Sequence, residues 1–144
     1  MTAKIPPMNL KNQTVLITGG AKRIGKAIAL AFAKKGTNIT LHYHHSKDEA
    51  IKVEEEIISR GVKCVLLKAD LSRNESVDQF IQENQNILSK TSILINSASI
   101  YMSLLSNSRN VIASPPKEGE AISRDKLFNI HYQAPLKLST YIGS

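Results

Sequence analysis

A glycine-rich segment at residues 18–25 has the composition of a phosphate-binding turn. It reads Thr-Gly-Gly-Ala-Lys-Arg-Ile-Gly and follows a short β-branched apolar run at 14–18. Where a buried strand ends in such a turn and a helix follows, backbone N–H groups and the helix dipole converge and bind phosphate. Gly19 permits a sharp exit from the strand, and Gly25 permits close approach of helix, sheet and ligand. A turn with a purely structural role is the alternative.

A cluster of histidines follows the next predicted strand. Residues 42–47 read His-Tyr-His-His-Ser-Lys, with no carboxylate before Asp48. In dinucleotide-binding folds an acidic residue at this place holds the ribose hydroxyls of NAD. A carboxylate would repel a 2′-phosphate, whereas imidazoles, a hydroxyl and the Arg23 guanidinium donate hydrogen bonds to it. The cluster therefore favours NADP(H). Its alternatives are a surface histidine cluster and an incidental metal site, which no neighbouring carboxylate or cysteine at ligand spacing supports.

These two segments need strands and helices that place them side by side. Apolar residues at three- and four-residue spacing predict three helices, at 24–35, 48–60 and 75–88. Apolar runs predict four buried strands, at 14–18, 38–43, 63–67 and 92–96. Crossovers of helix length exclude hairpins, so the sheet is predicted to be parallel with right-handed connections. The predicted fold class is α/β, a doubly wound parallel sheet of the Rossmann type.

The last third of the chain has a different character. Residues 100–123 are rich in Ser and Asn and contain Pro115-Pro116, which predicts a long loop of the kind that often carries function. Residues 124–141 have helical apolar spacing, which Pro135 is expected to bend or interrupt.

Composition limits the domain count and the cellular setting. The chain has 144 residues, of which 42% are hydrophobic, enough for one core, so residues 1–144 are predicted to form a single domain. Cys64 is the only cysteine, which excludes an intramolecular disulfide and fits a reducing compartment. No run approaches the roughly 18 apolar residues of a spanning helix. A cytoplasmic protein without membrane association is expected.

The net charge of +7 indicates a phosphorylated or polyanionic partner. A basic nucleic-acid-binding module is therefore an alternative. It is disfavoured because the Lys and Arg residues are scattered over predicted helix faces and only 5% of residues are aromatic.

Three motifs in order resemble those of the short-chain dehydrogenase/reductase family. They are T-G-x-x-x-x-x-G at 18–25, Asp70-Leu71 after the third strand, and Asn-Ser-Ala-Ser at 96–99 after the fourth. Arg23 in the turn, His-Tyr-His-His-Ser at 42–46, and the aromatic Tyr101 after the fourth-strand motif are similar to the pteridine reductase branch. The resemblance runs from about residue 14 to the chain end. It implies NADP(H) as cofactor and the N-terminal part of a short-chain dehydrogenase/reductase domain.

The resemblance also implies a role for particular residues. The pyrophosphate and ribose are implied to lie against Gly19, Arg23, Ile24 and Gly25. The 2′-phosphate would face His44, His45 and Ser46, and the adenine Asp70 and Leu71. The nicotinamide side would be formed by Asn96, Ala98 and Ser99. Tyr101 falls where the branch stacks an aromatic ring on a pterin substrate, and a loop anchor or core aromatic is its alternative.

Departures from the family leave enzyme activity open. The family's catalytic Tyr-x-x-x-Lys pair follows a fifth strand, but the chain's one such pair, Tyr43 and Lys47, lies beside the implied adenosine, so no catalytic residue is assigned. His131 stands where the family has an Asn that supports a proton-relay water, and Ser97 replaces another Asn. Two interpretations compete. The chain is either the cofactor-binding half of a longer NADPH-dependent reductase, with a small-molecule substrate and a dimer or tetramer when full length, or a shortened nucleotide-binding protein without chemistry.

Overall fold

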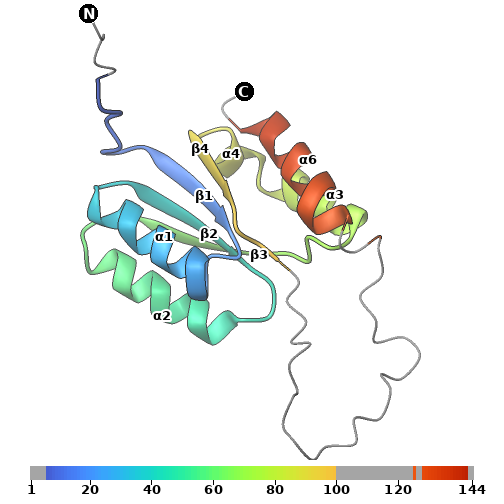
Figure 1. Cartoon of the computed structure of the whole chain (residues 1–144), viewed down its shortest axis with the longest axis horizontal. Helices are drawn as coiled ribbons and strands as arrows, with labels where there is room; N and C mark the ends of the chain where they lie inside the picture. The colour runs from blue at the N-terminus through green and yellow to red at the C-terminus, as the bar shows by residue number, and fades with distance from the viewer. Residues whose placement is uncertain (1–5, 100–124, 126–127, 143–144) are drawn as a thin grey trace, which may run out of the picture.

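The computed structural model describes residues 6–99, 125 and 128–142. In this part of the chain four parallel strands form one sheet in the order β3-β2-β1-β4 (Figure 1). The strands are β1 (Thr14–Thr18), β2 (Asn38–Tyr43), β3 (Cys64–Lys68) and β4 (Ile93–Asn96). The predicted doubly wound α/β fold is confirmed, and the strand bounds differ from the predicted ones by one residue at most.

The strand order sets where a ligand can bind. β1 lies between β2 and β4, with Val15 opposite Ile39 on one side and Ile93 on the other. The chain proceeds from β1 to β2 and β3 in one direction and then returns past β1 to form β4. Neighbouring crossovers therefore diverge at the carboxyl ends of β1 and β4, which is the switch point where open α/β sheets bind their ligands.

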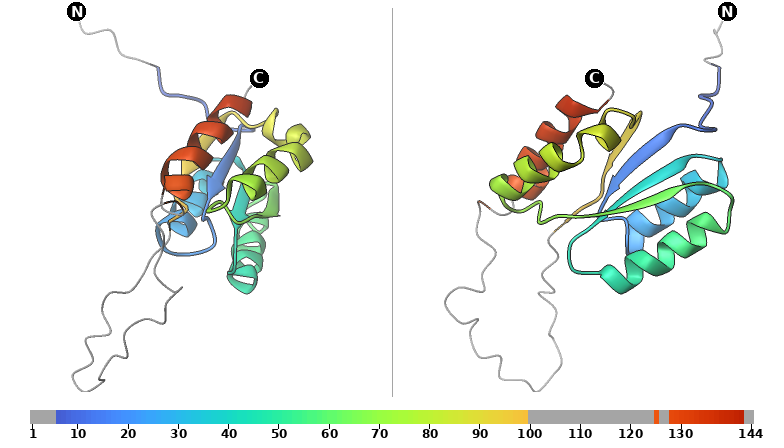
Figure 2. Two further views of the ribbon diagram at one scale, coloured as in Figure 1. Left: turned by 90° about the vertical axis from the view of Figure 1, so that its right-hand side faces the viewer. Right: turned by 180° about the vertical axis from the view of Figure 1, so that it is seen from behind.

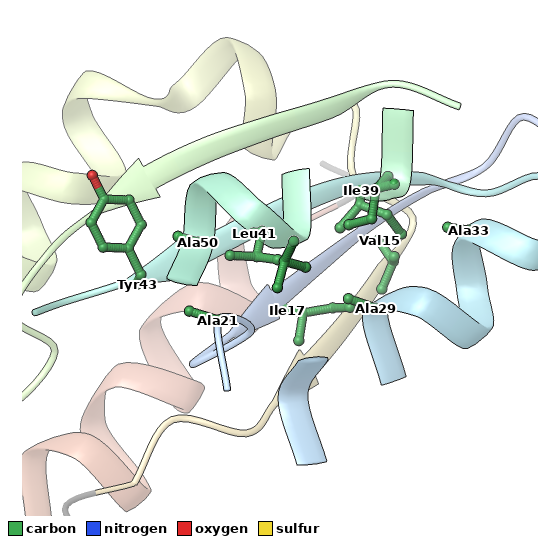
Figure 3. Close-up of a cluster of buried hydrophobic side chains, with 11 residues drawn as sticks. Val15, Ile17, Ala21, Ala29, Ala33, Ile39, Leu41, Tyr43 and Ala50 are labelled. Atoms are coloured by element: carbon green, nitrogen blue, oxygen red, sulfur yellow. The ribbon is translucent and has the colours of Figure 1, made fainter. Parts of the chain in front are cut away.

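Helices cover both faces of the sheet (Figure 2). On one face lie α1 (Arg23–Lys34) and α2 (Lys47–Ile58); on the other lie α3 (Asn74–Glu83), α4 (Gln85–Leu88) and α6 (Ala134–Tyr141). Side chains that alternate along β1 enter two different cores. Val15 and Ile17 pack with Ile39 and Leu41 of β2 and with alanines of α1 (Figure 3), whereas Leu16 packs with α3 and α6 residues.

The helix predicted over 75–88 is two helices, α3 and α4, divided at Asn84. The backbone of Asn84 leaves the helical region, with φ −114° and ψ 19°. Its side-chain amide donates a hydrogen bond to the Phe80 carbonyl at 2.8 Å. Asn side chains compete with the helix backbone for such carbonyls, so the helix breaks here even though the apolar spacing continues.

Pro135 does not interrupt the C-terminal helix, contrary to the sequence prediction. A wider π-helical turn, η1 (Asn129–Gln133), runs directly into α6, and Pro135 lies in the first turn of α6. A proline ring collides with the carbonyl four residues earlier, here that of His131, and a π-turn is one way in which helices absorb such a disturbance. None of the described helices is long and apolar enough to cross a bilayer.

Candidate functional site

A cavity of about 920 Å³ lies at the carboxyl ends of the strands. Its walls come from the segments after β1, β2, β3 and β4 and from Ile130 of η1. Nearly all the sequence-predicted site residues in the described part line it: Gly19, Arg23, Ile24, Gly25, His44, His45, Ser46, Asp70, Leu71, Ala98 and Ser99. Asn96 is exposed and is not among the lining residues. Tyr101 and the predicted loop at 100–123 lie outside the described residues.

The turn after β1 is tightly packed around its glycines. Gly19 has a φ of +64°, and a Cβ there would lie 2.7 Å from the Ala98 Cα. A Cβ at Gly25 would collide with the Gly19 carbonyl oxygen. The sequence expectation for both glycines therefore fits the geometry. Gly19 turns the chain away from the strand, and Gly25 lets the first turn of α1 lie against the segment that precedes it.

Thr18 ties this turn to the segment after β4. Its hydroxyl oxygen accepts hydrogen bonds from the N–H groups of Ser97 and Ala98, both at 3.1 Å. Thr18 is buried at the end of β1. The two wall segments at the switch point are thus held together by one buried side chain, which fixes the width of the cavity there.

The first turn of α1 presents an unneutralised positive end to the cavity. It has no acidic residue, and Lys22 at the N-cap makes no side-chain capping hydrogen bond. Helix N-termini of this kind bind anions through their unpaired N–H groups. Arg23, in this turn, has a φ of +49°, the left-handed region that costs a side-chain-bearing residue about 1–2 kcal/mol. Backbone strain of this kind is common at functional sites.

The segment after β2 forms an exposed rim of imidazoles. The rings of His44 and His45 lie with centroids 3.6 Å apart at an angle of 39°. Partial burial lowers the pKa of His44, and His45 and Lys68 add to the effect while Asp70 opposes it. At neutral pH a neutral His44 ring offers one N–H donor, and an anion bound beside it would raise its pKa. Ser46 follows as the residue that precedes α2.

Lys22 lines the cavity and was not singled out from the sequence. Its ammonium lies 2.8 Å from the Glu49 carboxylate, and both side chains are about half exposed. The signal that could have found it is its place beside Arg23, at the mouth of a turn with the form of an anion site. Ala21, His42, Tyr43, Ser72, Ser97 and Ile130 also line the cavity and were not predicted.

The segment after β3 carries a carboxylate in a fixed position. One oxygen of Asp70 accepts hydrogen bonds from the Ser72 hydroxyl at 2.6 Å and the Ser72 N–H at 3.0 Å. Burial raises the pKa of Asp70, but these hydrogen bonds and nearby cationic groups outweigh it, so the pKa lies below its usual value. Asp70 is therefore an ionised acceptor at neutral pH, suited to an exocyclic amine.

The donor set suits a phosphorylated nucleotide. Positive or donor groups occupy the walls after β1 and β2, and an acceptor stands after β3. No group of three His, Cys, Asp or Glu within the described ranges could hold a metal ion. Tyr43 is buried in the core beside α2, on the β2 side of β1 and away from β4. His131 is exposed and does not line the cavity.

Comparison with known proteins gives consistent matches. Residues 13–140 match the family model described as short chain dehydrogenase. The short-chain dehydrogenase/reductase homolog YusS of Bacillus subtilis is 38% identical over 93 residues, which are 65% of this chain and 85% of YusS. The 3-oxoacyl-[acyl-carrier-protein] reductase FabG of Staphylococcus epidermidis is 35% identical over 89 residues, which are 62% of this chain and 36% of FabG.

A solved structure resembles nearly the whole chain. FolM alternative dihydrofolate reductase 1 from Brucella canis, complexed with NADP, matches with a TM-score of 0.68 and 26% identity. The match covers 92% of this chain and 48% of FolM. The chain thus spans about half the length of this structure and little more than a third of FabG.

Proposed function

Because the chain belongs to the short-chain dehydrogenase family, whose model it matches over residues 13–140, we propose that its cavity binds NADP(H). We further propose that residues 1–144 form one cofactor-binding domain of an NADPH-dependent oxidoreductase. The observation that carries the proposal is the set of donors after β1 and β2 around one cavity at the switch point. The NADP complex of the Brucella FolM structure supports the same cofactor.

The proposed orientation of the nucleotide follows the charges of the walls. The pyrophosphate lies at the first turn of α1, with Ile24 and Gly25. The 2′-phosphate lies among Arg23, His44, His45 and Ser46, and the adenine lies against Leu71 with its amine toward Asp70. The nicotinamide end extends toward Ala98 and Ser99, on the β4 side of β1.

The residues of this chain bind and orient the cofactor, and the nicotinamide when bound supplies a hydride. Proton donation to the substrate is a separate requirement. Tyr43 is the one tyrosine among the described lining residues, and it lies across β1 from the proposed nicotinamide end. We therefore assign it no proton transfer. A nucleotide-binding protein without chemistry remains the second candidate, and this position of Tyr43 favours it for residues 1–144 taken alone.

We propose a pteridine or dihydrofolate type of substrate for the whole reductase. The support is the likeness to FolM, described as an alternative dihydrofolate reductase, together with the branch-like residues after β2. Tyr101 is the proposed stacking partner. In the full-length protein, Tyr101→Ala is expected to weaken dihydropterin binding severalfold, since aromatic pairs contribute about 0.5–1.5 kcal/mol, and to leave NADPH affinity unchanged. An unchanged KM for dihydropterin would remove the pterin assignment.

We also propose that the protein forms a homo-oligomer through η1 and α6. Phe128, Tyr132 and Leu136 recur at four-residue spacing and each is more than half exposed. The rings of Phe128 and Tyr132 stack with centroids 4.9 Å apart. A second copy of this apolar row would cover it, because an isologous interface places the same surface on both subunits. Tyr132→Lys is expected to shift sedimentation toward the monomer.

Calorimetric titration of the chain with NADPH and with NADH tests the cofactor proposal. A charge-assisted contact is worth about 1.5–3 kcal/mol, so NADPH should bind about tenfold more tightly or better. Adenosine 2′,5′-bisphosphate against 5′-AMP serves as a matched pair without nicotinamide. Equal affinities within both pairs would contradict the 2′-phosphate assignment, and absence of binding would contradict the function. Pterin-dependent NADPH oxidation that is lost in Tyr43→Phe would show that Tyr43 is catalytic.

A further inference from the structure

His42, near the carboxyl end of β2, is held by both of its ring nitrogens. The Gly19 N–H donates a hydrogen bond to Nδ1 at 3.1 Å. Nε2 lies 3.0 Å from the carbonyl oxygen of Ala69, directly after β3. The ring is 2% exposed and meets Phe80 of α3 edge to face, with centroids 5.8 Å apart. One buried side chain therefore contacts the segments that follow β1 and β3 while belonging to β2.

The partners of the ring determine its tautomer. An N–H group can only donate and a carbonyl can only accept, so Nδ1 must be unprotonated and Nε2 must carry the hydrogen. Burial lowers the pKa of His42 to about 4, a shift that its bond to Ala69 and the charge of Asp70 oppose and that His44 reinforces. At neutral pH the ring is thus uncharged and in a single tautomer.

The main chain of the same residues continues this connection. The Gly20 N–H donates to the His42 carbonyl at 3.0 Å, and the Ala69 N–H donates to the Tyr43 carbonyl at 3.2 Å. The segments that meet at His42 are the phosphate-binding turn, the start of the imidazole rim and the segment that leads to Asp70. These are the walls proposed above for the pyrophosphate, the 2′-phosphate and the adenine.

We propose that His42 is a positioning residue of the nucleotide site, whose Nε2–H imidazole holds the turn after β1 and the segment after β3 in the mutual arrangement that an adenosine 2′-phosphate half requires. The inference rests on the proposed NADP(H) function. It has one direct consequence for the ligand. The Gly19 N–H is already occupied by His42, so the pyrophosphate is met by N–H groups of the first turn of α1 instead.

Two variants separate positioning from general stability. His42→Phe keeps a ring of similar size against Phe80 and removes both hydrogen bonds. Thr37→Val is the matched control, because Thr37 is fully buried at the opposite end of β2 and its hydroxyl donates to the Leu10 carbonyl at 3.0 Å. Both lose buried hydrogen bonds of the strand and are expected to lower the Tm. His42→Phe should weaken NADPH binding about tenfold or more, whereas Thr37→Val should change it less than twofold.

His42→Asn sharpens the test, since its amide retains an acceptor near the position of Nδ1 and loses the reach to Ala69. Its NADPH affinity should lie between those of wild type and His42→Phe. If wild type binds NADPH and His42→Phe binds it within twofold, this inference alone is overturned. If wild type binds neither NADPH nor NADH, the proposed function is overturned and this inference with it.

A measurement on the wild-type chain covers the case in which His42→Phe does not fold. Long-range ¹H–¹⁵N spectra should show Nδ1 as an unprotonated acceptor and Nε2 as protonated at neutral pH. The Gly19 amide proton should exchange slowly with solvent. A mixture of tautomers, or a fast-exchanging Gly19 amide, would overturn the proposal.

Discussion

Two walls of the same cavity are built in different ways. The turn after β1 is enclosed: Gly19 and Gly25 pack against neighbouring backbone, and Thr18 and His42 reach it from buried positions. The rim after β2 is open to solvent, and His44 and His45 chiefly contact each other. Changes in the first wall should therefore affect folding and all nucleotides together. Changes in the second should alter the choice between nucleotides with little cost to the fold.

The largest effect is expected for Gly25→Ala in the enclosed wall. The added Cβ collides with the Gly19 carbonyl, a backbone atom that cannot move without opening the turn. Overpacking of this kind costs about 1–3 kcal/mol, and NADPH and NADH binding should both be lost. Urea denaturation and calorimetry measure the two effects. Gly61→Ala is the control, since Gly61 has a φ of +82° and open space around it, so it should lose stability without losing affinity.

Acid should weaken the enclosed wall next. His42 has a pKa of about 4 when folded and about 6.5 when unfolded, so between these values only the unfolded chain takes up the proton. Stability contributed by neutral His42 is complete above pH 6.5 and is lost as the pH falls through 4, by about 3 kcal/mol in total. Asp70 and His44 face the ring and modulate this value in opposite directions. Urea titrations from pH 7 to 4 should show this slope, which His42→Phe should reduce. A flat profile in wild type would contradict it.

The fold was predictable from the sequence where one signal dominated. Buried parallel strands are short apolar runs, so β1 and β2 were located to the residue. The break at Asn84 was missed because apolar periodicity does not register a side-chain amide that bonds to the Phe80 carbonyl. Pro135 was expected to disrupt a helix because the π-turn before it leaves no trace in the spacing.

The candidate site was predictable where backbone form requires particular residues. Gly19 and Gly25 followed from the turn, and the imidazole rim followed from the absence of a carboxylate. His42 was overlooked because it was grouped with the exposed histidines after it, although a polar ring within an otherwise apolar buried strand is itself a signal. Asn96 was expected at the cavity by resemblance, but the last residue of β4 directs no described lining atom into it. Local sequence contains no information on which strand-end residues face the cavity.

Arg23 belongs to both walls, so Arg23→Gly should separate the two effects. Glycine adopts a φ of +49° without strain, and the substitution should raise the free energy of unfolding by about 1 kcal/mol. Loss of the guanidinium should weaken NADPH binding about tenfold or more and leave NADH binding nearly unchanged. Arg60→Ala, a cation at the far end of α2, is the control for net charge. Equal weakening of both cofactors would place Arg23 away from the 2′-phosphate.

The smallest effect is expected at the edge of the open wall, for Glu49→Gln. Glu49 pairs with Lys22 at the cavity mouth, and an exposed pair of this kind contributes about 0–1 kcal/mol, so stability should hardly change. Removal of the carboxylate releases the Lys22 ammonium toward the 2′-phosphate, so NADPH affinity should rise severalfold while NADH affinity stays constant. Screening weakens exposed charges beyond roughly 10 Å at 0.1 M salt, so the gain should shrink as salt is added. Glu56→Gln removes the partner of Lys26 and Arg60, neither of which lines the cavity, and should leave both affinities unchanged. An equal gain in Glu56→Gln would mean that net charge, rather than the release of Lys22, governs the affinity, and the open wall would then lack a residue-specific role in choosing the cofactor.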